Sequence, residues 1–193
     1  AIAAGGATPG RDNTIQYVTI ASLGDAQEFG DLIADSSYSG GATACSPTRG
    51  VMGGGSKLVS GSTNSIGYIT MATTGNSVDF GDANTTSTSP SGVASSSTRG
   101  VFIHSTGTDI EYVTISTLGN AQDFGDLVTS SNGGGAISNS IRAANGGAFA
   151  DSANQNYIYY ITISTTGNGQ DFGDLVNRLS SIGGYSDSHG GIS

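Results

Sequence analysis

Residues 112–127 read YVTISTLGNAQDFGDL, and this stretch occurs four times in the chain with small changes. The copies begin at tyrosines that are 51, 44 and 48 residues apart: Tyr17, Tyr68, Tyr112 and Tyr160. In every copy a phenylalanine follows a glycine by five positions; the phenylalanines are Phe29, Phe80, Phe124 and Phe172. A period of about 40 to 50 residues of strand-like sequence is typical of a β-propeller or another repeat array.

Each copy predicts a β-hairpin. In residues 15–21, IQYVTIA, strict alternation places Tyr17 and Thr19 on one face and Val18 and Ile20 on the other. Both faces carry apolar or β-branched side chains, as expected of a strand that is covered on both sides. The following S/T-L/T-G-N/D sequence predicts a turn. The AQEFGDL sequence and its copies then form the second strand, and we expect the repeated tyrosines to belong to the core.

The rest of each unit predicts one or two further strands. Small-residue strands are expected at residues 1–6, 50–55, 100–105 and 143–150. After each hairpin, a Ser/Gly-rich segment of variable sequence could hold one irregular strand. In the last unit, residues 174–182 could instead form a helical turn, but we interpret them as loop plus edge strand. The unit closes with S-x-T-R-G at 46–50 and 96–100, with degenerate versions at 140–144 and 186–193.

The predicted fold is all-β. We expect a β-propeller-like ring of about four repeats of 44–51 residues, with three to four antiparallel strands in each. A β-solenoid is the alternative. Residues 1–193 form a single repeat domain, with units at approximately 1–46, 47–96, 97–140 and 141–193. Strands from the two ends, 1–6 and 189–193, are candidates for closing the ring, and several chains joining edge to edge are the alternative to a four-unit ring.

Composition excludes several classes of function. The chain has 6 basic and 15 acidic residues and a net charge of −9. No basic stripe is present to bind a nucleic-acid backbone, so we expect no nucleic acid as partner. No run of 18 apolar residues occurs, so we expect no membrane span. The single cysteine, Cys45, excludes an internal disulfide framework, and the two histidines are too few for a histidine metal site.

The repeated acidic pair in D/E-F-G-D is the strongest candidate for chemistry. Its second members could line a channel and bind a hard cation such as Ca²⁺; they are Asp31, Asp82, Asp126 and Asp174. However, residues three apart on a strand point to opposite faces unless the intervening glycine bulges the strand. We therefore favour a structural interpretation, in which carboxylates pair with the phased arginines and join repeat to repeat; these are Arg49, Arg99 and Arg142. No catalytic residue and no cofactor are predicted.

The paired motifs SPTRGVMGGG at 46–55 and YVTIASLGDAQEFGDL at 17–32 resemble a repeat family of marine phages, especially cyanophages. The resemblance extends over nearly the whole chain and includes the closing SDSHGGIS. Members of that family are described as virion structural, fibre-like or kelch-like proteins. The second unit departs from the pattern, with Asp82-Ala83 where leucine is usual, and the third lacks T-R-G. The resemblance implies a virion-associated role and no catalytic residues.

From the resemblance and the repeats we expect a non-enzymatic viral structural protein located in the virion. It would be a capsid decoration or knob, or a module associated with a tail fibre, and it would dock on other virion proteins. We also expect a homo-oligomer or multiple copies on a particle. The alternative is a lectin-like propeller that binds a receptor or host-surface glycan through its variable loops, because loops on a rigid scaffold often carry recognition.

Overall fold

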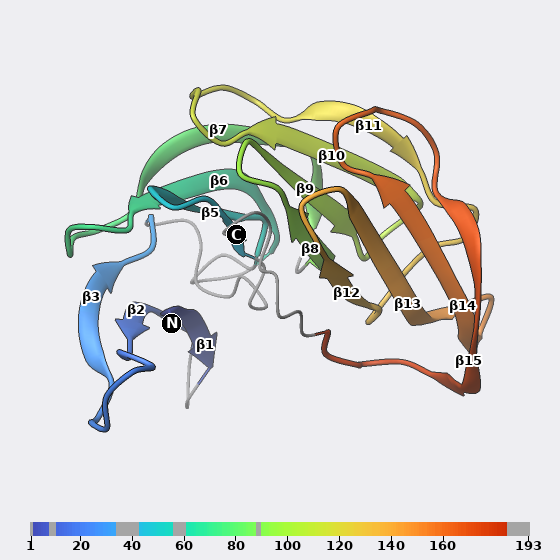
Figure 1. The fold of residues 1–193 in the computed structure, drawn as a ribbon, viewed down its shortest axis with the longest axis horizontal. Helices are drawn as coiled ribbons and strands as arrows, with labels where there is room; N and C mark the ends of the chain where they lie inside the picture. Colours follow the sequence, from blue (N-terminus) through green and yellow to red (C-terminus); the bar gives the residue numbers. More distant parts are fainter. Residues whose placement is uncertain (1, 8–10, 34–42, 56–60, 88–89, 185–193) are drawn as a thin grey trace.

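The structure is a computed structural model that describes residues 2–7, 11–33, 43–55, 61–87 and 90–184 (Figure 1). Within these ranges the chain is all-β, with no helix and therefore no helix able to cross a membrane. The strands form four antiparallel sheets of three or four strands, and the sheets do not close into a barrel. The first sheet contains β1 (Ile2–Ala7), β2 (Arg11–Tyr17) and β3 (Gln27–Asp31). The second contains β4 (Thr43–Cys45), β5 (Arg49–Gly53), β6 (Thr63–Thr70) and β7 (Val78–Ser87).

The third and fourth sheets follow the same plan. The third contains β8 (Pro90–Ser95), β9 (Arg99–His104), β10 (Asp109–Thr114) and β11 (Gln122–Asp126). The fourth contains β12 (Gly135–Ser138), β13 (Arg142–Ala150), β14 (Ala153–Thr162) and β15 (Gln170–Leu179). In each sheet the strands pair in chain order, so every sheet is a simple meander.

The variable segments do hold strands, as predicted, but each strand joins the sheet that follows it. β4, β8 and β12 pair with the small-residue strands β5, β9 and β13 of the next repeat. The unit boundaries drawn from the sequence, at 46/47, 96/97 and 140/141, therefore each separate an edge strand from its own sheet. The S-x-T-R motif makes the tight turn between these two strands, where the Arg49 N–H donates to the Ser46 hydroxyl at 3.1 Å.

The predicted hairpin is confirmed in all four sheets. In the first, Tyr17 lies opposite Gln27 and Gln16 lies opposite Glu28, but the next partner of the strand is Gly30. Phe29 is therefore the extra residue of a β-bulge, and the same register shift recurs in the other three hairpins. In the last repeat the sequence after the bulge continues as strand β15 and not as a helical turn.

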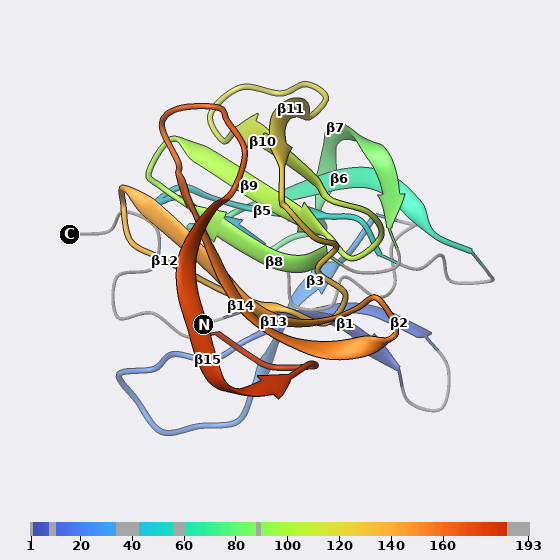
Figure 2. The ribbon, with the colours of Figure 1, turned by 90° about the vertical axis from the view of Figure 1, so that its right-hand side faces the viewer.

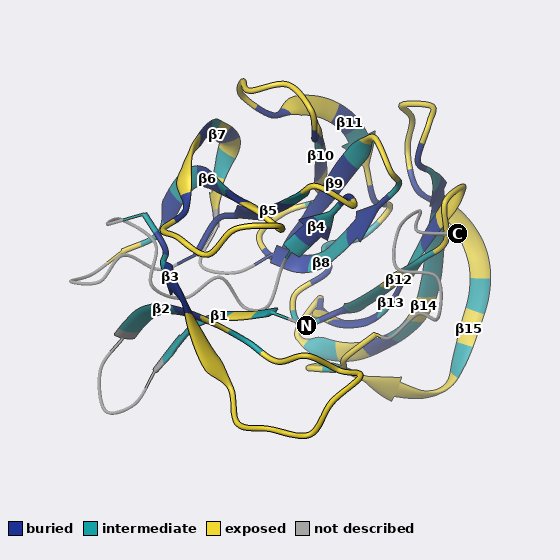
Figure 3. Cartoon of the chain, turned by 60° about the vertical axis from the view of Figure 1, so that its left-hand side comes forward, coloured by how far each residue is buried: buried dark blue, intermediate teal, exposed yellow. Residues whose placement is uncertain are grey.

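The four sheets follow one another along a curved path (Figure 1). Strands β8 and β12 lie on the inside of the curve, and β7, β11 and β15 lie on the outside. Strand β4 lies beside β8 (Figure 3). Figure 2 views the molecule from the side of the fourth sheet, with β15 in front. Buried apolar clusters fill the space between consecutive sheets; the cluster between sheets two and three, for example, includes Phe80, Val113 and Ile115.

Burial is uneven along the curve. Strands β5, β8 and β9 of sheets two and three are largely buried, whereas β15 is mostly exposed (Figure 3). The strand from residues 189–193 that was expected to close the ring lies outside the described residues. The structure therefore establishes an all-β stack of four sheets whose two end faces differ from the three interfaces inside it.

Candidate functional site

The repeated tyrosine and phenylalanine form one aromatic pair in every sheet. The ring centroids are 6.0 Å apart in all four pairs, and the rings meet edge to face. The tyrosines are half-buried, which only partly agrees with the prediction that they are core residues. In repeats one, three and four the tyrosine hydroxyl donates to a glutamine at the end of the hairpin; the pairs are Tyr17–Gln27, Tyr112–Gln122 and Tyr160–Gln170.

Two of the three phased arginines, Arg49 and Arg99, join neighbouring sheets, but not through carboxylates. The Arg49 guanidinium lies 4.7 Å above the ring of Tyr68 and donates from Nη1 to the carbonyl oxygen of Ile115 in the next sheet at 3.0 Å. Arg99 makes the same two contacts one repeat later, with Tyr112 at 4.2 Å and the Ile163 carbonyl at 2.8 Å. The prediction of arginine–carboxylate pairs was wrong, because among the described residues these arginines form no ion pair.

Arg142 occupies the same position in the fourth sheet and differs in one respect. Its guanidinium lies 4.9 Å above the Tyr160 ring, as in the other repeats. The Arg142 side chain is exposed, since no following sheet covers it. The repeated arginine thus belongs to the sheet-to-sheet junction. The last sheet has this arginine, although no further sheet packs against it among the described residues.

The centre of each junction is a close approach of two backbones. The N–H of Gly119 donates to the carbonyl of Phe80 at 2.9 Å, and the Ala121 N–H donates to the carbonyl of Asp82 at 2.8 Å. In return the N–H of Asp82 donates to the side-chain oxygen of Asn120 at 3.1 Å. The same three bonds join sheets one and two, and sheets three and four. The G-N turn of one repeat therefore docks on the F-G-D bulge of the repeat before it.

The bulge glycine is required by this approach. Gly81 has a φ of +146°, and a Cβ at this position would lie 2.5 Å from the carbonyl carbon and oxygen of Gly119. Gly125 stands in the same relation to Gly167, with 2.6 Å to both atoms. No other residue type combines this backbone conformation with so short a contact.

The repeated aspartates do not form a metal site in the described part of the chain. Asp82, Asp126 and Asp174 have exposed side chains and Asp31 is half-buried, and each lies in a different sheet. No group of three or more His, Cys, Asp or Glu side chains is gathered within the described residues. The backbone N–H groups of Asp31, Asp82 and Asp126 bond to the next sheet, so the junction uses their main chain and not their carboxylates.

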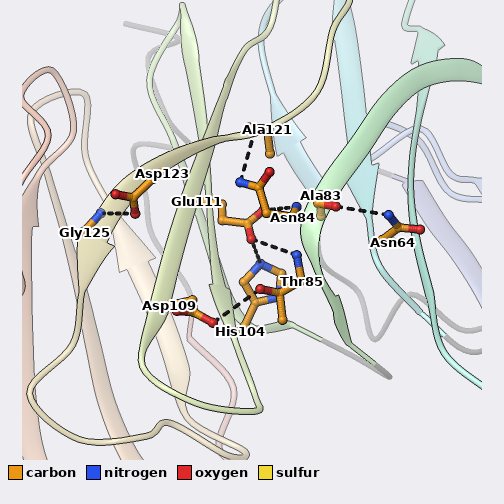
Figure 4. A network of polar contacts seen from close by, with 10 residues as sticks. All are labelled: Asn64, Ala83, Asn84, Thr85, His104, Asp109, Glu111, Ala121, Asp123 and Gly125. Atoms are coloured by element: carbon orange, nitrogen blue, oxygen red, sulfur yellow. Dashed lines mark hydrogen bonds and ion pairs between the residues drawn. The ribbon is translucent and has the colours of Figure 1, made fainter.

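One buried polar cluster breaks the repeat symmetry. The carboxylate of Glu111, on β10, accepts hydrogen bonds from the backbone N–H groups of Asn84 and Thr85, on β7, at 2.9 and 3.0 Å (Figure 4). The Nε2 atom of His104 lies 3.5 Å from Glu111 Oε1, an ion-pair distance but too long for a good hydrogen bond. His104 and Glu111 are only 2% and 3% exposed.

Burial by itself raises the pKa of Glu111. The neighbouring His104 and the hydrogen bonds from Asn84 and Thr85 outweigh this effect and hold the pKa below its ordinary value. The carboxylate is therefore stabilised in its charged form, where it joins the second sheet to the third. A pair this enclosed does not touch a substrate, so we interpret it as a structural contact.

Local pattern does not predict this cluster. His104 is one of only two histidines, and the strand that holds Glu111 follows the same alternation as its copies. The available signal was the loss of repeat identity, because the residues that correspond to Glu111 are Gln16, Gly67 and Tyr159. A charged residue at one copy of a repeated strand position therefore indicates a buried partner for that charge.

Shallow surface hollows of about 100 to 150 Å³ lie beside three of the repeated tyrosines. Each is lined by the tyrosine, its hydroxyl-bonded glutamine and the turn around the following glycine; the tyrosines are Tyr17, Tyr112 and Tyr160. In repeats three and four the arginine covers one ring face and the phenylalanine edge contacts the ring as well. These tyrosines are therefore poorly disposed to stack flat on a sugar.

Comparison with known proteins adds no family. No protein-family model matches the chain. A search of curated proteins also finds no significant match. The function must therefore be argued from the repeats and their packing.

Proposed function

We propose that the chain is a non-enzymatic structural module of a virus particle, a capsid decoration, knob or tail-fibre-associated unit that docks on other virion proteins. The observation that carries the proposal is the use of the repeated motif residues in architecture. In sheets two and three the tyrosine, phenylalanine, arginine and glycine of the repeat contact one another or the next sheet. The resemblance to phage repeat proteins supports the same conclusion.

A propeller-like arrangement is part of this proposal. The support is the order of strands, with β8 and β12 inside and β7, β11 and β15 outside the curve (Figure 1). The antiparallel meander in every sheet also suits a propeller blade. Electron microscopy of the purified protein tests this point, since radial sheets around an axis are expected and parallel coils along one axis would refute the arrangement.

The proposed role is tested by locating the chain in purified particles of the virus that encodes it. Antibodies against the recombinant protein should label the particle surface at a regular position, and quantitative mass spectrometry should give a fixed copy number per particle. A chain that appears in lysates of infected cells but is absent from purified particles would contradict the proposal.

Binding of a host-surface glycan is the second candidate, and the repeated hollows favour it. They present the tyrosine hydroxyl, the glutamine amide and threonine side chains, which suit a small polyhydroxylated ligand. An oligosaccharide panel should then show up to three sites per chain, and Gln122→Ala should remove one of them. Repeat two has Val78 in place of the glutamine and serves as the internal control. Failure of every oligosaccharide to bind would exclude this function.

A further inference from the structure

The three sheet-to-sheet junctions inside the molecule share the same central hydrogen bonds. Each of the two end sheets has one of the two surfaces that form such a junction, but that surface has no partner among the described residues. We call the side of a sheet that bears the F-G-D bulge its trailing face, and the side that bears the G-N or G-D turn its leading face. Inside the molecule, every trailing face is covered by the leading face of the next sheet. The trailing face of sheet four and the leading face of sheet one have no such partner among the described residues.

The trailing face of sheet four is built like the others but lies open. Phe172 is 61% exposed, whereas the corresponding Phe29, Phe80 and Phe124 are at most 7% exposed. A Cβ at Gly173 would meet nothing within 4 Å, although the corresponding glycines touch the next sheet. The Gly173 φ of +139° is nevertheless the conformation that the junction uses in the other repeats.

The leading face of sheet one is also complete and also open. Ile20 is 83% exposed, while the residues at the same position of the three covered sheets, Met71, Ile115 and Ile163, are 38%, 1% and 1% exposed. Ala26 is exposed, whereas its counterpart Ala121 is buried. A Cβ at Gly30, Gly81 or Gly125 would meet the turn glycine of the next sheet, whereas a Cβ at Gly173 would meet nothing within 4 Å, so sheet one does not dock on sheet four of its own chain.

We propose that the trailing face of sheet four of one copy binds the leading face of sheet one of a second copy, head to tail. The internal junctions specify the contacts. The N–H groups of Gly24 and Ala26 would donate to the carbonyls of the partner's Phe172 and the partner's Asp174. The carboxylate of Asp25, where the other turns have asparagine, would accept from the N–H of the partner's Asp174.

The exposed Arg142 completes the match. The corresponding Arg49 and Arg99 each donate to the carbonyl of an isoleucine in the next sheet. Those isoleucines, Ile115 and Ile163, correspond to Ile20 of sheet one. The partner's Arg142 would therefore reach the Ile20 carbonyl. Such a contact is heterologous, so repeated association gives a closed ring or an open filament according to the rotation between copies. The inference rests on the packing alone and does not depend on the proposed function.

Two blocking variants test the proposal. Ile20→Asp places a charge on the leading face and Phe172→Asp places one on the trailing face. Both side chains are more than half exposed, so both variants should fold. Val176→Asp is the matched control on strand β15, because the corresponding Val128 stays 70% exposed although its sheet is covered. Arg142→Glu is a second trailing-face variant that leaves the aromatic pair intact.

Sedimentation velocity and light scattering provide the readout. Wild type and Val176→Asp should associate as concentration rises, and more strongly at high salt, because each chain carries a net charge of −9. Each blocking variant alone should remain monomeric. An equal mixture of Ile20→Asp and Phe172→Asp should form a dimer and no larger species, because each retains the face that the other has lost.

Three results would overturn the proposal. Wild type could remain monomeric up to about 1 mM, a concentration at which even a contact worth about 4 kcal/mol becomes visible. The blocking variants could associate as wild type does, which would place the interface elsewhere. The mixture could stay monomeric, which would exclude a head-to-tail contact between these two faces.

Discussion

Replacing Gly81 with alanine tests how strongly the close backbone approach determines the stability of the stack. The new Cβ would lie 2.5 Å from the carbonyl carbon and oxygen of Gly119 and 2.9 Å from the backbone nitrogen of Asn120. These are main-chain atoms held by the junction hydrogen bonds, so they cannot move aside by a side-chain rotation. The φ of +146° adds backbone strain for any residue with a Cβ.

The two effects can be separated with a matched variant. Backbone strain costs about 1 to 3 kcal/mol, and overpacking against a rigid neighbour costs about 1 to 3 kcal/mol more. Gly81→Ala should therefore lower the free energy of unfolding by about 2 to 6 kcal/mol. In Gly173→Ala the φ is similar, at +139°, but nothing lies within 4 Å of the new Cβ. Only the strain remains there, so the expected loss is about 1 to 3 kcal/mol.

Urea unfolding followed by circular dichroism measures both losses. The protein should be dilute enough to be monomeric, so that association at the trailing face of sheet four does not contribute. Gly81→Ala should be clearly the more destabilised of the two variants. Equal losses for Gly81→Ala and Gly173→Ala would show that the junction tolerates a Cβ, and the account of the bulge glycine would then be refuted.

Three further predictions use the same unfolding assay. Arg99→Ala should cost about 1.5 to 3 kcal/mol because it removes a charged hydrogen bond to the next sheet as well as an aromatic contact, whereas Arg142→Ala should cost under about 1 kcal/mol in the monomer; equal losses would argue against the inter-sheet bond. The pKa of Glu111 is lowered from 4.5, so the stability that its carboxylate provides is present above that pH and lost as the pH falls through the lowered pKa. Wild type should therefore lose more stability than Glu111→Gln between neutral pH and about pH 3, and parallel pH profiles would contradict this account. Gln122→Val should cost under about 1 kcal/mol, because repeat two already has Val78 at this position and the hydrogen bond it removes is exposed; a larger loss would mean that the hydroxyl contact holds the hairpin.

Local pattern predicted most of the secondary structure correctly. Alternation in IQYVTIA and the turn that follows it specify the hairpin. The bulge at the phenylalanine was not predicted, because the glycine after it only makes a bulge possible. The edge strands were also anticipated in the variable segments. That these strands pair with the following sheet was not predicted. Pairing across a turn such as the one before Arg49 depends on strand order, which periodicity alone does not determine.

The partners of the arginines could not be predicted for a different reason. The sequence offered carboxylates at a matching period, and opposite charges suggested a pair. The structure uses the carbonyl oxygens of Ile115 and Ile163, and every residue has a carbonyl, so no residue type reveals this acceptor. The same argument covers the junction as a whole, since its central bonds join main-chain groups.

Because the central bonds of the junction join main-chain groups, repeats can be exchanged during evolution without loss of these bonds. The central bonds of the junction need only a glycine and an asparagine at the turn and a glycine at the bulge, so these bonds can form between any two units of the same kind. Recombination between two repeats, as between the turns at Gly75 and Gly119, would delete or duplicate one unit and leave both new neighbours with matching surfaces. Unit number and the variable segments can therefore diverge quickly between related genes while the packing that connects the units is preserved.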